Sequence, residues 1–132
     1  IRGPHMKGGG VTFGPRNVRN FKRMMPKKMR RLALFSALSE KSRSNEVLVL
    51  DAYEASAPKT KMFAEMVKAL PIKQDVLFLL DARNEIFEKS SKNIANVKTM
   101  LVNYLNISDM RKYEKIIFLE KALDAMKKIF TS

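Results

Sequence analysis

Cysteine is absent from this 132-residue chain and histidine occurs once, which removes several kinds of chemistry. Without cysteine there is no disulfide, no thiolate metal site and no cysteine nucleophile. The one histidine, His5, lies in residues 1–6, which have the composition of a cloning scar, so we expect it to lie outside the natural chain. We therefore expect no metal site and no cofactor, and we do not expect an enzyme.

Long apolar runs are also missing. No stretch approaches the roughly 20 residues needed to cross a membrane, so we expect no membrane partner. Glycine is scarce too: beyond the expected scar, it occurs only at Gly8, Gly9, Gly10 and Gly14. The turns that follow the predicted strands therefore lack the glycine-rich loops that cradle a dinucleotide or a nucleoside triphosphate.

Acidic residues are nearly absent from the first third of the chain. Residues 1–43 hold 12 of the 26 lysines and arginines but only one of the 13 acids, Glu40. The remaining residues hold 14 basic and 12 acidic side chains, so their charges almost cancel. Because a merely solvated surface normally mixes both signs, this asymmetry favours a polyanionic partner.

Short apolar runs alternate with helical stretches through the rest of the chain. The runs are continuous, as in strands that are covered on both faces. We predict strands at residues 46–51, 75–81, 97–102 and 115–119, and helices at residues 27–42, 61–70, 84–91, 108–112 and 120–130. This alternation indicates an α/β fold: a doubly wound, mostly parallel four-stranded sheet with flanking helices, preceded by an extended basic arm.

Local signals add detail to three of the predicted helices. Pro26 suits the start of the first helix, and Thr60 and Ser108 suit the N-caps of two later ones. Apolar residues recur at spacing three along one slowly drifting face of the first helix: Met29, Leu32, Phe35 and Leu38.

We divide the chain into a cloning scar at residues 1–6, an extended basic arm at residues 7–26 and a single α/β domain at residues 27–132. Glycine and proline keep the arm from regular structure. Its apolar residues show no sustained period, so we expect them to anchor the arm on a surface while its cations face outward.

The candidate RNA-binding residues lie in the arm and the first turns of the helix that follows. Cations there can meet phosphates, glycines let the backbone approach RNA closely, and Phe13 can stack or anchor. They are Lys7, Gly8, Gly9, Gly10, Phe13, Arg16, Arg19, Lys22, Arg23, Lys27, Lys28, Arg30 and Arg31.

Two other functions stay open at this point. Asp51 and Asp81 end two strands that we expect to be adjacent, and acids at that edge of a parallel sheet can hold Mg²⁺ in a nucleotide- or Mg-dependent enzyme. Alternatively, each aspartate caps the turn that follows it. The third function is that of a protein-interaction module that recruits a partner through the edge of the α/β domain.

Five blocks of sequence, in order, resemble the L four family of bacterial large-subunit ribosomal proteins. The two most specific are KGGGVTFGP at residues 7–15 and PKKMRRLALFSALS at residues 26–39. The others are PKTK at residues 58–61, NIANV at residues 93–97 and LNISDM at residues 105–110. The first block is similar to the return limb of that family's long loop.

The resemblance implies a structural constituent of the large ribosomal subunit that binds ribosomal RNA and supports subunit assembly in the cytoplasm. It implies large-subunit ribosomal RNA and neighbouring ribosomal proteins as partners. Compared with the family, the N-terminal strand, first helix and outbound loop limb are missing. That loss should expose a sheet edge or an apolar groove, so we expect self-association, or coverage by the arm.

Overall fold

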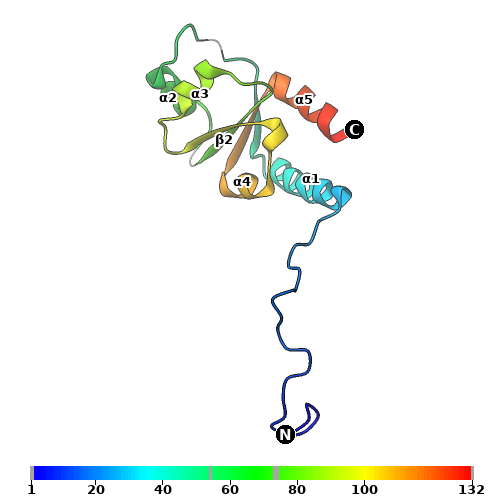
Figure 1. Ribbon diagram of the computed structural model, residues 1–132. Helices are drawn as coiled ribbons and strands as arrows, with labels where there is room; N and C mark the ends of the chain where they lie inside the picture. The colour runs from blue at the N-terminus through cyan, green and yellow to red at the C-terminus, as the bar shows by residue number, and fades with distance from the viewer. Residues whose placement is uncertain (1, 54, 73–74, 132) are drawn as a thin grey trace.

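Four parallel strands form the centre of the protein, and the computed structural model describes residues 2–53, 55–72 and 75–131 (Figure 1). Ile1 of the expected scar, Glu54 and Ser132 therefore lie outside the described residues. The strands are β1 (Val47–Leu50), β2 (Val76–Leu80), β3 (Val97–Leu101) and β4 (Lys115–Leu119). Their order across the sheet is β1-β4-β2-β3, and every neighbouring pair is parallel. The predicted fold class is confirmed.

Strand β4 lies between β1 and β2, with Ile117 level with Leu48 on one side and with Phe78 on the other. The expectation that the strands ending at Asp51 and Asp81 are adjacent is therefore wrong. Sequence order does not specify this arrangement, because β4, which follows β1, β2 and β3 in the described sequence, inserts between β1 and β2.

Helices cover both faces of the sheet. On one face lie α1 (Lys27–Arg43), α4 (Ile107–Lys112) and α5 (Glu120–Thr131), with the short turn η1 (Val102–Tyr104). On the other lie α2 (Thr60–Ala69) and α3 (Glu85–Ser91). Alternate residues of β2 serve the two cores: Leu77 and Leu79 face α1, whereas Val76, Phe78 and Leu80 face α2 and α3.

The core between the sheet and α2–α3 is built on aromatic rings. Tyr53, Phe63, Phe78 and Phe87 meet edge to face, with ring centroids 5.0–5.6 Å apart. Phe63, Phe78 and Phe87 are fully buried. Edge-to-face packing of this kind adds to the stabilisation from burial alone, so this side of the domain is firmly held.

Helix α1 is held to the sheet by its inner side and by one lysine. Leu34 is buried, and Ala37 and Leu38 pack beside it on the core. At the end of the helix, Lys41 Nζ lies 2.5 Å from Glu46 Oε2, 3.1 Å from the Tyr113 carbonyl and 2.9 Å from the Glu114 carbonyl. These bonds fix the helix against the starts of β1 and β4, so they set the direction in which its first turn points.

The outer side of α1 keeps apolar residues in contact with solvent. Met29 is 57% exposed, Leu32 66% and Phe35 39%. Of the residues that recur at spacing three, only Leu38 packs on the core. The buried stripe instead follows the spacing of three and four residues from Leu34 to Lys41, because an α-helix repeats every 3.6 residues.

The edge strand β1 is also uncovered on its outer flank. It is the first strand of the sheet order, and Val49 is 51% exposed. The arm extends away from the domain rather than along this edge (Figure 1). In the described residues β1 is thus an edge strand, and the expectation that the arm covers it is wrong. In the part of the chain that is described, no helix is long and apolar enough to cross a membrane.

Candidate nucleic-acid interface

Residues 2–26 form no helix or strand and lead away from the domain at the start of α1 (Figure 1). Their large apolar side chains are open to solvent, with exposed fractions from 78% to 96% at Val11, Phe13, Val18, Phe21 and Met24. The expectation that these residues anchor the arm on a surface is therefore wrong. The arm projects away from the domain at the N-terminal end of α1 (Figure 1).

The first residues of the arm fold back into a small hook. The Met6 amide donates to the Gly3 carbonyl at 3.0 Å, and the Gly9 amide donates to the Met6 carbonyl at 2.8 Å. Gly8 has φ +77°, and a Cβ at Gly9 would lie 2.0 Å from the Gly3 carbonyl oxygen. Two of the predicted glycines thus serve a close approach of the chain to itself, whereas Gly10 has open space around it.

The middle of the arm groups one predicted aromatic with two predicted cations. Phe13, Arg16 and Arg19 line a shallow cavity of about 540 Å³, together with Val11 and Val18. The Arg19 guanidinium also lies over the Phe21 ring, 5.2 Å from its centroid. Val11, Val18 and Phe21 were not among the predicted site residues, although the sequence shows that they lie within three residues of an arginine or lysine of the arm or beside Phe13.

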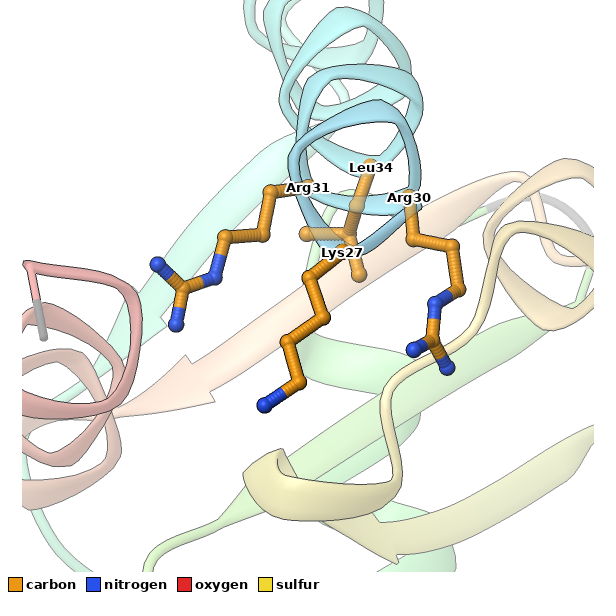
Figure 2. Close-up of a pocket in the computed structure, with 4 residues that line it drawn as sticks. All are labelled: Lys27, Arg30, Arg31 and Leu34. Atoms are coloured by element: carbon orange, nitrogen blue, oxygen red, sulfur yellow. The ribbon is translucent and has the colours of Figure 1, made fainter. Parts of the chain in front are cut away.

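Three more predicted cations come together at the start of α1. Lys27, Arg30 and Arg31 line a cavity of about 300 Å³ whose remaining wall is Leu34. Figure 2 shows that the three cationic side chains extend from the same side of the helix as Leu34 and spread apart from one another. Helical spacing of three and four residues brings them together, because residues 27, 30 and 31 share one face of a helix.

The positive charge at the start of α1 has no local compensation. The helix begins after Pro26 without a side-chain cap, and its first turn holds no acid. Cations at this end oppose the helix dipole, at a cost of about 0.3–1 kcal/mol each when exposed. None of the predicted cations forms an ion pair with another described residue. The uncompensated positive charge therefore favours an anion at this site, and three cations around one cavity suit a phosphate group.

The remaining predicted residues are accessible but not grouped. Lys7, Lys22, Arg23 and Lys28 are exposed and line neither of the two cavities. Arg31 is half-buried at the helix. The predicted cations therefore form a string along the arm that leads to one cluster on the domain.

A second candidate site lies at the carboxyl ends of the strands. Asp51 and Asp81 line one cavity of about 520 Å³ with Tyr53, Glu85 and Lys121. Glu85 is paired with Lys89 at 3.0 Å, and this hydrogen bond lowers the pKa of the Glu85 carboxyl. Among the described residues no group of three acids or histidines is arranged to hold a metal ion. Asp51 and Asp81 thus share this cavity although their strands are not adjacent.

Known proteins of one family match this chain along almost its whole length. The model of the ribosomal protein L4/L1 family matches residues 1–129. A large ribosomal subunit protein uL4 from Alkaliphilus oremlandii is 40% identical over 130 residues, which is 98% of this chain and 62% of that protein. Proteins of the same name are 38% identical in a Thermoanaerobacter species and 39% identical in Mycoplasma mycoides.

The extent of these matches can be compared with the length of the chain and with its first six residues. The chain spans about three fifths of the length of the relatives that it matches. The family match also includes residues 1–6, which we expected to be a cloning scar. The division of the chain into a scar, an arm and a domain stays a prediction.

Proposed function

Because the chain belongs to the ribosomal protein L4/L1 family, we propose that it is a structural constituent of the large ribosomal subunit. In this role it binds ribosomal RNA through the arm and the start of α1 and supports subunit assembly. Its partners are large-subunit ribosomal RNA and neighbouring ribosomal proteins, and it acts on the ribosome in the cytoplasm. The family is one of ribosomal proteins rather than enzymes, which agrees with the expectation from the sequence.

The observation that carries the RNA-binding proposal is the uncompensated charge of the arm and of the α1 cavity. No acid precedes Glu40 in the chain. Lys27, Arg30 and Arg31 surround one cavity without an anionic partner among the described residues. A phosphate in this cavity would remove the repulsion among the three cations and between them and the helix dipole.

The arm and the α1 cluster have separate tasks in this mechanism. The cluster sits on a helix fixed by Lys41 and the core, so it offers a phosphate a preformed site. The arm makes few contacts with itself and none of its large apolar residues is buried, so it can follow the path of the RNA backbone. The arm then loses conformational entropy when it becomes ordered on binding, which lowers the affinity per contact.

The dependence of affinity on salt tests this function. If about 6–10 cations meet phosphates, affinity for a ribosomal RNA fragment should fall about 10³–10⁵-fold between 50 and 200 mM salt, by analogy with DNA. The triple variant Lys27→Gln, Arg30→Gln, Arg31→Gln should bind more weakly and show a shallower slope. Lys59→Gln, Lys61→Gln, Lys68→Gln removes the same charge from exposed sites at α2 and should keep the slope of the unchanged protein. A salt slope near zero would contradict the proposal.

A further inference from the structure

The apolar side chains of the arm alternate with cations at short intervals. Phe13 is followed by Arg16, and Phe21 lies between Arg19 and Lys22. Both rings are among the most exposed large side chains of the protein, at 88% and 78%. Because covering apolar surface is the main favourable term in most associations, the partner of the arm should be one that can cover these rings.

An apolar protein surface is a poor match for this pattern. Covering either ring with such a surface would draw the neighbouring cations out of water without supplying an anion, which is costly. The first acid of the chain is Glu40, so the arm itself supplies no compensating charge. The partner must therefore present flat apolar faces and negative charges at similar short intervals.

Unpaired nucleotides have this arrangement, because each one carries a flat base and a phosphate. An aromatic ring can stack on the base while a neighbouring cation meets the phosphate. In a duplex the bases already stack on one another inside the helix, so a ring on an extended arm cannot reach their faces. The spacing of rings and cations thus favours single strands and loops over duplex RNA.

The geometry around the two rings supports stacking. The Arg19 guanidinium lies over the Phe21 ring at 5.2 Å from its centroid, and the Phe21 side chain is 78% exposed, so a base can reach the ring. Phe13 has φ 49° in the turn before Gly14, and its side chain points into solvent. Phe13 lines the same cavity as Arg16 and Arg19, so one nucleotide there would meet a ring and two cations.

We propose that Phe13 and Phe21 stack on unpaired nucleobases, so that the arm selects single-stranded or loop segments of RNA over duplex. This inference rests on the RNA-binding function proposed above and adds the class of RNA that the arm recognises. The cations supply binding to either kind of RNA, and the rings supply the preference.

Binding of two RNAs to the full chain tests the proposal. One is an unstructured single strand and the other a perfect duplex with the same number of phosphates, both measured by fluorescence anisotropy. The double variant Phe13→Leu, Phe21→Leu keeps apolar bulk but removes both rings. Its affinity for the single strand should fall at least about 5-fold, the lower end of what one base–aromatic stack contributes. Its affinity for the duplex and its salt slope should not change.

The matched control is Met24→Ala, Met25→Ala, which trims two other exposed apolar side chains of the arm that line neither cavity. It should bind the single strand nearly as well as the unchanged protein, and an equal loss in both variants would overturn the assignment to stacking. Unchanged binding of the phenylalanine variant to the single strand, with the salt slope intact, would overturn stacking but leave the proposed function standing. Failure of the unchanged protein to bind either RNA would contradict both.

Discussion

At the scale of single residues, Asp109 shows how a charged side chain is stabilised on this domain. Lys98 Nζ lies 2.6 Å from its carboxylate, and the Asn106 amide donates to the other oxygen at 2.8 Å. The hydrogen bond from Lys98 is the main reason that the pKa of Asp109 lies below its ordinary value, and burial partly opposes it. The ionised carboxylate therefore links β3 to the start of α4.

This lowered pKa predicts a dependence of stability on pH. A carboxyl whose pKa is lower in the folded than in the unfolded state stabilises the fold fully above its unfolded pKa, near 3.9. That contribution is lost as the pH falls through the folded pKa. Asp109→Asn should therefore lower the free energy of unfolding by about 1–2 kcal/mol at pH 7 and by much less near pH 2.

Urea unfolding at the two pH values measures the difference. Asp124→Asn is a suitable control, because Asp124 is 69% exposed and its pairing with Lys127 is at the surface. A surface pair contributes little, so this variant should change stability by less than about 1 kcal/mol at either pH. An equal loss for Asp109→Asn at both pH values would show that its charge is not the cause.

Some roles of single residues could be predicted from the sequence and others could not. The grouping of Lys27, Arg30 and Arg31 could be predicted from the sequence, because helical spacing places these residues on one face. The absence of compensating acids could be predicted too, because the first acid of the chain is Glu40. The caps were harder to assign. Asn106, not Ser108, caps α4 by accepting from the Asp109 amide at 2.7 Å, and α2 begins at Thr60 without a side-chain cap. Several residue types can cap, and the choice depends on where the backbone turns.

At the scale of elements, the position of α1 depends on Lys41. Its side chain is 16% exposed and bonds to one carboxylate and two carbonyls from two other parts of the chain. Replacing Lys41 with Met should lower the free energy of unfolding by about 1–3 kcal/mol, because Glu46 and both carbonyls lose a donor in a partly buried site. Thermal or urea unfolding, monitored by circular dichroism, gives the value.

The control for this prediction is Lys89→Met. Lys89 is 65% exposed and pairs with Glu85 four residues earlier on α3, so its loss should cost no more than about 0.5 kcal/mol. Equal losses for Lys41→Met and Lys89→Met would mean that the bonds of Lys41 do not fix α1. In that case the direction of the arm would rest on the packing of Leu34, Ala37 and Leu38.

Elements of the fold were predicted more reliably than their arrangement. The four strands lie within a residue or two of their predicted ranges. A short continuous apolar run such as the one around β2 is typical of a strand that is covered on both faces. The position of β4 between β1 and β2 could not be read in the same way. Strand order depends on which helices can pack on each face, and that is decided by contacts between distant residues.

At the scale of the whole molecule, the uncovered β1 edge and the outer side of α1 predict self-association. Val49, Met29, Leu32 and Phe35 are all exposed apolar residues of these two elements. An open strand edge and an exposed apolar helix surface are each a ready site for another chain. Sedimentation velocity should show the proportion of dimers or larger species rising with protein concentration, and Val49→Lys should reduce it.

Met62→Lys is the control, because Met62 on α2 is also 51% exposed but lies on the other face of the sheet. It should leave self-association unchanged. A protein that stays monomeric at every concentration would contradict the prediction, and an equal effect of the two lysine variants would assign it to net charge rather than to the β1 edge.

The insertion of β4 between β1 and β2 also has a consequence for the time course of synthesis. Strand β1 ends at Leu50, and the only strand that it pairs with in the described structure begins at Lys115. At about 5–20 residues per second, translation of the intervening segment takes several seconds, during which β1 has no neighbour. The arm and the cations of α1 are made before that interval begins. During synthesis these cations are therefore available to RNA while the sheet that follows them in the sequence is still incomplete.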